Sequence, residues 1–285
     1  MGLVLRAGRA EDAAVCGRIC YDAFTAIADQ HNFPRDWPSA EFAQMVLGSL
    51  FARRDVFSVV AELDGQVVGS NCMADTGAVA GIGPITVALT TQNGAVGRAM
   101  MQHMLALADE RRFASVRLVQ AAYHCRSMSL YAKLGFEVRE PLVAMQGGPL
   151  GIALPGFAVR TASRDDLDAA SRLCLSIHGH ERRAELREAI EQGTATVVER
   201  DEAITGYATV IGFWGHAVGA TTDDIKALIG SAPAIMGAGI LVPTRNGTLF
   251  RWCLENRLRV TQPLTLMSRG LYNEPRGAFL PSILF

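Results

Sequence analysis

The sequence contains an internal repeat, and this repeat constrains the fold more than any other feature. Three segments of the first half recur in the second half in the same order: residues 4–20 as 158–174, 59–69 as 196–206, and 131–145 as 253–267. The first match pairs Arg6 with Arg160 and Cys20 with Cys174. Chance similarity does not explain three matches in one order, so the sequence predicts two tandem copies of one α/β domain.

Length and turn residues divide the chain at one place. At 285 residues it exceeds the usual size of a single domain. The segment QGGPLGIALPG, residues 146–156, is rich in Gly and Pro and suits a connection. We therefore expect an N-terminal domain over residues 1–147, a linker over 148–156 and a C-terminal domain over 157–285.

The first copy shows a strand and helix pattern that predicts its fold class. Asp64-Gly65 marks a hairpin, Ser39 is a candidate helix cap, and Gly135 ends a helix. The expected strands are 3–7, 56–62, 66–74, 82–89, 115–122 and 136–146, and the expected helices are 10–29, 40–53, 95–111 and 125–134. Hairpins followed by alternating strands and helices predict an α/β fold with a mixed, partly parallel sheet and helices on its faces.

Composition excludes several classes of function. The formal net charge is −1 and there is no basic block, so nucleic-acid binding is not expected. No apolar stretch reaches 18 residues, and the first twelve residues lack a signal-peptide pattern, so we expect a cytoplasmic protein that does not insert in membranes. The six cysteines form no C-x-x-C pair and are expected to be buried thiols. No metal site is expected.

One short turn raises the question of phosphate binding. Residues 92–97, QNGAVG, connect a predicted strand to a predicted helix. Backbone N–H groups and the dipole at such a turn suit a pyrophosphate, provided that the side chains are small. An ordinary strand-to-helix turn has the same composition, and neither G-x-x-x-x-G-K-[ST] nor G-x-G-x-x-G is present. From the residues alone, both interpretations stay open.

Two motifs together make the first copy resemble the GNAT superfamily of acetyl-CoA-dependent N-acetyltransferases. That family carries [QR]-x-x-G-x-[GA] at this turn, and here Gln92 opens the motif and Gly97 closes it. A second family motif corresponds to HCRSMSLYAKLGF, residues 124–136. The resemblance covers residues 3–146 and departs at Ala95, which replaces a glycine, and at His124, which replaces an asparagine.

The resemblance implies roles for individual residues. Tyr131 would be the general acid that protonates the CoA thiolate, although a core aromatic is the alternative. The strand expected at residues 82–89 would pair with the pantetheine arm and would separate from the next strand of the sheet. The cofactor-binding residues that the resemblance implies are Ile85, Thr86, Val87, Leu89, Gln92, Asn93, Gly94, Ala95, Val96, Gly97, Arg98, His124 and Ser127. For His124 we favour a polar helix cap, and a catalytic group is the alternative.

The acceptor site is less defined. The strand that holds the base in many family members has no carboxylate here, so Asp75, Glu62, a water chain or the terminal carboxylate of Phe285 are the options. The loop 29–37 contains His31, Phe33, Asp36 and Trp37, which could line an acceptor pocket or anchor the loop. His178 and His180 form an H-x-H pair without a third ligand at a suitable spacing, which favours a surface loop.

The second copy lacks the expected chemistry. Asp223 and Asp224 open the helix where the phosphate turn should lie, and Cys253 aligns with Tyr131. The resemblance of the first copy to the GNAT superfamily implies an N-acetyltransferase that moves an acetyl group to a small-molecule amine by direct attack in a ternary complex. Acylation of a protein amine and a non-catalytic acyl-CoA sensor are the alternatives, and a monomer or homodimer is expected.

Overall fold

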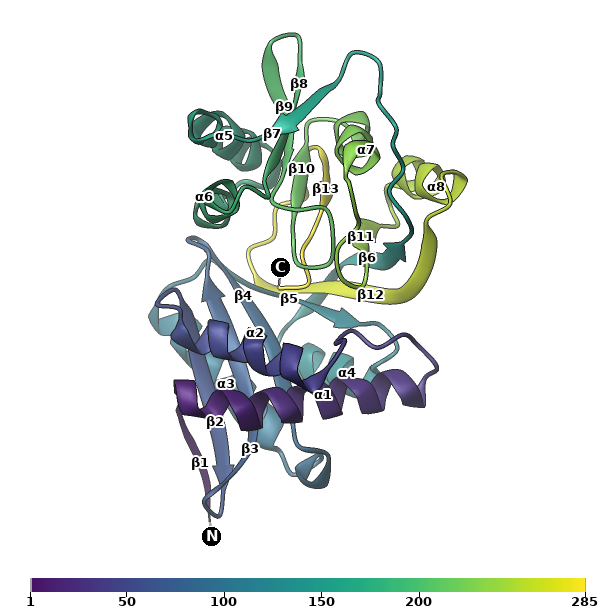
Figure 1. The fold of residues 1–285 in the computed structure, drawn as a ribbon. Coiled ribbons are helices and arrows are strands. Elements are labelled where there is room, and N and C mark those ends of the chain that lie inside the picture. Colours follow the sequence, from purple (N-terminus) through teal and green to yellow (C-terminus); the bar gives the residue numbers. More distant parts are fainter. Residues whose placement is uncertain (1, 285) are drawn as a thin grey trace.

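The computed structural model describes residues 2–284 and forms two α/β lobes (Figure 1). The first half contains β1 (Leu3–Ala7), α1 (Ala13–Gln30), α2 (Ala40–Ala52), β2 (Val56–Leu63), β3 (Gln66–Asp75), β4 (Val79–Val87), α3 (Val96–Glu110), β5 (Ser115–Ala121), α4 (Cys125–Lys133) and β6 (Glu137–Gln146). The second half contains β7 (Ala158–Thr161), α5 (Leu167–His178), α6 (Arg183–Glu191), β8 (Thr196–Arg200), β9 (Ala203–Ala208), β10 (Ala217–Gly219), α7 (Thr222–Ser231), β11 (Ile240–Pro243), α8 (Gly247–Glu255), β12 (Arg259–Gly270) and β13 (Ala278–Leu280). The order of elements repeats from β1–β6 to β7–β12, which confirms the tandem α/β arrangement.

The larger sheet has eight strands in the order β1-β2-β3-β4-β5-β12-β6-β11. Its neighbours are antiparallel except for β4 and β5, which run parallel and pair only where residues 79–81 face residues 115–117. Beyond Gly81 these two strands are no longer paired. The expected mixed sheet with a splayed parallel pair is therefore confirmed.

The two copies exchange their last strands. Strand β12 belongs to the second copy by sequence, yet it lies between β5 and β6 of the first. Strand β6 in turn pairs with β11 of the second copy. Figure 1 shows β12 in yellow, running between the two lobes. The linker separates the repeats along the chain, but residues 259–270 complete the sheet of the first copy.

Local signals explain most element boundaries. Ser39 caps α2 by accepting a hydrogen bond from the Phe42 N–H at 3.2 Å. Asp64 and Gly65 both have positive φ, as a tight hairpin turn requires. One expectation was wrong: the strand placed at 82–89 runs from Val79 to Val87, and a 3₁₀ turn over Leu89–Thr91 follows it. The chain then enters the turn over residues 92–95 that leads to α3.

A repeated ion cluster explains part of the sequence repeat. Arg6 bonds both carboxylate oxygens of Asp12, at 2.7 and 2.8 Å, and also bonds Glu62 at 2.7 Å. The second copy repeats these contacts with Arg160, Asp166 and Glu199. Each cluster joins the first strand of its copy to the helix start and to the neighbouring strand. The arginine holds the pKa of Asp12 below its usual range.

Two apolar layers cover the larger sheet. Helix α3 packs on one face through Met100, Met101 and Met104, and α1 with α2 packs on the other (Figure 1). A further cluster combines Leu142 of β6 with Leu264 of β12, so the two copies share a core. No helix in residues 2–284 is long and apolar enough to cross a membrane.

Candidate functional site

The turn between β4 and α3 is held in place by side chains. Gln92 Nε2 donates to the Val87 carbonyl at 3.2 Å. Arg126 on α4 donates to Gln92 Oε1 at 2.6 Å and to Asn93 Oδ1 at 3.2 Å. The sequence did not indicate this arginine, because its contact with the turn depends on the packing of α4. The contacts fix the turn before any ligand binds.

The N-terminus of α3 is open to an anion. The first amides of a helix lack intrahelical partners, and Ala95 at the cap position offers no side-chain acceptor. Gly94 and Arg98 are exposed, whereas Val96 turns its side chain into the core. Ala95 has φ 63°, a left-handed conformation that costs an alanine about 1 kcal/mol relative to glycine. The turn therefore presents backbone amides that could bind an anion, at some cost in strain.

The edge of β4 adjoins this turn. Ile85, Thr86 and Val87 pair with β3 on one side, and on the other side β5 has already separated from β4. Their backbone groups on that side can pair with an extended ligand. Leu89 lies beyond the strand and is 51% exposed, so the structure separates it from this edge.

Helix α4 presents three polar side chains on one face. His124, Ser127 and Tyr131 follow i, i+3 and i+7 spacing. Ser127 Oγ lies 2.8 Å from His124 Nδ1. Burial raises the pKa of Tyr131 to about 12 and lowers the pKa of His124 to about 4. Both groups are therefore neutral near pH 7. The His124 ring makes no cap bond to the helix amides, so a simple polar cap does not describe it.

The loop after α1 packs beside α4. Phe33 stacks on Tyr123 with ring centroids 4.2 Å apart, and His31 lies 5.3 Å from the same ring. Trp37 is only 4% exposed and packs against Trp214 of the second copy. The structure thus brings His31 and Phe33 together near α4, while the Trp37 ring forms part of a core.

The candidate bases lie in different places. Asp75 accepts from the Gly77 N–H at 2.9 Å within the β3–β4 turn, and Glu62 pairs with Arg6. Phe285 lies outside the described residues. Asp36 is half-buried, and its carboxylate accepts from Gln262 Nε2 on β12. The sequence could not indicate Gln262, because the exchange of β12 places it there.

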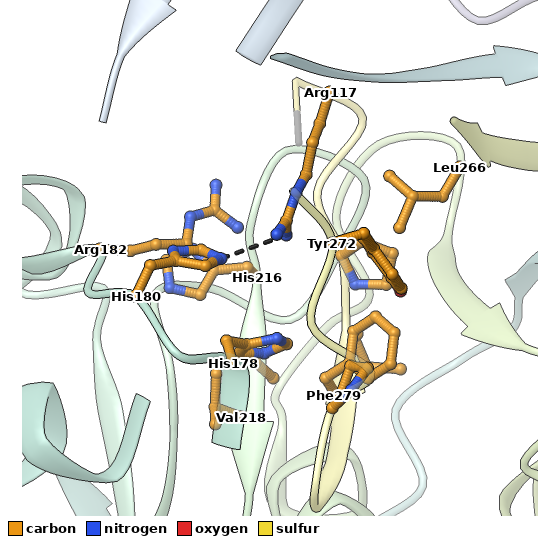
Figure 2. Close-up of a pocket in the computed structure, with 13 residues that line it drawn as sticks. Arg117, His178, His180, Arg182, His216, Val218, Leu266, Tyr272 and Phe279 are labelled. Carbon is orange, nitrogen blue, oxygen red and sulfur yellow. Dashed lines mark hydrogen bonds between the residues drawn. The ribbon is translucent and has the colours of Figure 1, made fainter. Parts of the chain in front are cut away.

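A buried cluster of arginine and histidine side chains lies between the copies (Figure 2). Arg117 of β5 reaches toward His180, with Nη1 and Nε2 3.1 Å apart, and His178 lies nearby. The expected surface loop for the two histidines was wrong, because both are buried: His180 contacts Arg117 of β5, and His178 packs on Phe279 of β13. The cavity measures about 10 Å³, room for roughly one water molecule. No group of three metal-ligating side chains occurs within residues 2–284.

In the second copy, protein groups fill the corresponding positions. By the repeat, residues 217–219 of β10 match residues 85–87, and β13 pairs with them antiparallel. At the start of α7, Thr221 accepts from the Asp224 N–H, and the Asp224 carboxylate accepts from the Thr221 N–H at 2.7 Å. A strand thus covers the edge of β10, and a carboxylate caps the start of α7, whereas the corresponding edge of β4 and the start of α3 have no such partners within residues 2–284.

In comparisons with known proteins, the family match lies in the first copy. Residues 22–136 match the family model described as the acetyltransferase (GNAT) family. No curated protein matches the sequence. The whole chain is similar to a Pyrococcus horikoshii structure assigned as an acetyltransferase, with 17% identity, a TM-score of 0.73, and coverage of 97% of this chain and 92% of that one.

Two further solved structures share the fold along nearly the whole chain. A GCN5-related N-acetyltransferase from Sphaerobacter thermophilus has 15% identity and a TM-score of 0.59, with coverage of 95% of this chain and 96% of that one. A tandem GNAT protein from the clavulanic acid biosynthesis pathway has 15% identity and a TM-score of 0.57, with coverage of 95% and 100%. At these identities the likeness shows a shared fold.

Proposed function

The N-terminal copy of this chain is an acetyltransferase domain of the GNAT family, within a tandem GNAT fold, and we propose that it acetylates a small-molecule primary amine with acetyl-CoA. The observation that carries this proposal is the contrast between the copies. The first has an open helix N-terminus beside a free strand edge, whereas protein groups fill both positions in the second.

Acetyl-CoA supplies the acetyl group as a thioester. The backbone amides of residues 94–98 would hold its pyrophosphate, and Arg98 would add charge at the helix start. The free edge of β4 at residues 85–87 would pair with the pantetheine arm. These contacts would direct the thioester into the space where β4 and β5 separate, beside the polar face of α4.

Tyr131 would protonate the departing thiolate. Its raised pKa keeps the phenol protonated at neutral pH. A thiolate in the same buried space would also have a raised pKa, because burial disfavours both anions, so burial does not by itself widen the pKa gap between the phenol and the thiol. Ser127 and His124 would then connect the phenol to the acceptor side through hydrogen bonds.

Replacing Tyr131 tests this assignment. Tyr131→Phe should lower turnover about 100-fold, the usual contribution of a positioned proton donor, and leave the affinity for acetyl-CoA unchanged. Ser129→Ala is the matched control, because Ser129 is exposed on α4 and bonds only the Cys125 carbonyl. Turnover measured by CoA release and affinity measured by calorimetry separate the two effects. Unchanged turnover would remove Tyr131 from the mechanism.

A screen of primary amines tests the reaction itself. Acetyl-CoA binding without acetylation of any aliphatic or aromatic amine would replace the transferase proposal with the sensor alternative. Product formation with small amines, rather than with peptide N-termini or lysine side chains, would support the proposed acceptor class.

A further inference from the structure

We propose that Asp36 is the binding site for the ammonium group of the acceptor, and that Gln262 from the exchanged strand β12 positions its carboxylate. This inference rests on the proposed function, because it identifies the acceptor as a cation at neutral pH. It also gives the second copy a part in the acceptor site of the first.

The charge of Asp36 is not compensated by the chain. The side chain is half-buried on the α1–α2 loop and forms no ion pair with any cation in residues 2–284. Its neighbour Arg35 turns away and pairs with Asp29, at 2.7 Å. Burial raises the pKa of Asp36. A partly desolvated carboxylate of this kind is stabilised when a ligand supplies the missing cation.

Gln262 can face Asp36 in only one orientation. The Asp36 carboxylate accepts hydrogen bonds, so Gln262 Nε2 must point to it. Gln262 Nε2 lies 2.5 Å from Asp36 Oδ1. Gln262 Oε1 then accepts from the Tyr123 hydroxyl at 3.0 Å. Gln262 is only 1% exposed. Its amide is therefore locked between two partners and holds the carboxylate in one place.

The surroundings suit an amine with an apolar body. Tyr123 stacks on Phe33, which places an aromatic pair next to the Asp36–Gln262 contact. Tyr123 also directly precedes His124, the first residue of the polar face of α4. An ammonium at Asp36 would thus lie beside the start of α4, the helix that carries Tyr131. A small arylalkylamine fits both the charge and the rings.

Titration calorimetry with a matched pair of ligands tests the site. The probes are 2-phenylethylammonium and the neutral 2-phenylethanol, each added to the full chain with and without CoA. The wild-type chain should bind the ammonium at least tenfold more tightly than the alcohol. Asp36→Asn should abolish this preference, and Asp29→Asn, which removes an exposed carboxylate from the last turn of α1, should keep it.

The role of Gln262 has its own readout. Gln262→Leu should weaken ammonium binding at least threefold and leave alcohol binding unchanged, whereas a general loss of structure would weaken both ligands. Equal affinity of the wild-type chain for the two probes, or an ammonium preference that survives Asp36→Asn, would overturn the proposal. Acetyl-CoA titration is measured separately, so a failure of the proposed transferase function remains distinguishable from a failure of the Asp36 site.

Discussion

Single residues determine how this chain responds to pH. His180 and His216 are buried beside Arg182 in the second copy, and burial lowers the pKa of each to about 4. His216 also lies 3.0 Å from the Tyr207 hydroxyl and 3.3 Å from Glu185. Both imidazoles are therefore neutral in the folded chain at pH values where exposed histidines become charged.

We expect the stability to fall between pH 6.5 and pH 4. In this range the unfolded chain binds protons at these histidines that the folded chain does not bind, so the free energy of unfolding decreases as the pH decreases. Above pH 6.5 both states are neutral at these positions and the contribution is constant. Thermal unfolding at several pH values measures the slope.

A pair of variants tests whether the buried histidines cause this pH dependence of stability. His216→Gln should make the loss of stability between pH 6.5 and pH 4 shallower, whereas His103→Gln, an exposed histidine on α3, should leave it unchanged. Identical slopes for His216→Gln and wild type would contradict the assignment.

At the scale of elements, the site depends on how α4 packs against the β4–α3 turn. Arg126 extends from the first turn of α4 and bonds both Gln92 and Asn93. It is exposed, so it contributes little to the core. Its role is to hold the turn in the conformation that exposes the amides of α3.

Removing this contact should weaken the cofactor site selectively. Arg126→Ala should lower acetyl-CoA affinity about tenfold with little change in the unfolding temperature, because a mobile turn must be ordered on binding. Arg126→Lys keeps the charge and cannot span both acceptors, so it should also weaken binding. Full affinity in the lysine variant would show that Arg126 acts through charge alone.

Local patterns predicted the elements of the first copy well, and non-local contacts explain the rest. Ser39 and the Asp64-Gly65 turn act through neighbouring residues, so the sequence located their elements. The contact between His180 and Arg117 depends on the packing of the two copies, and the contact between Gln262 and Asp36 depends on the exchange of β6 and β12. No pattern within one copy specifies which sheet a strand of the other copy joins, so the sequence could not predict them.

At the scale of the whole molecule, the strand exchange makes each copy dependent on the other. Strand β12 lies between β5 and β6, and its apolar residues pack with those of β6 in a shared core. An isolated first copy would leave an edge of β5 and both edges of β6 without partners. Unpaired edges of this kind favour aggregation.

Separating the copies tests this dependence. Residues 2–147 expressed alone should aggregate or fail to unfold cooperatively, whereas coexpression with residues 148–285 should yield a complex that copurifies. Circular dichroism with thermal unfolding and size-exclusion chromatography give the readout. A monomeric, cooperatively folded fragment 2–147 would contradict a structural requirement for β12.

Calorimetric titration of the full chain with acetyl-CoA tests the central claim most directly. We expect one site per chain, because the N-terminus of α3 is open and that of α7 is closed by its own capping box. Gly97→Glu should abolish binding because it adds negative charge at the turn. Steric clash is not the cause, because a Cβ added at residue 97 would lie 3.6 Å from Val87, an ordinary contact. Gly97→Gln is the uncharged control, and Asp223→Asn on α7 should bind normally. Absence of binding, two sites per chain, or full affinity in Gly97→Glu would contradict the account.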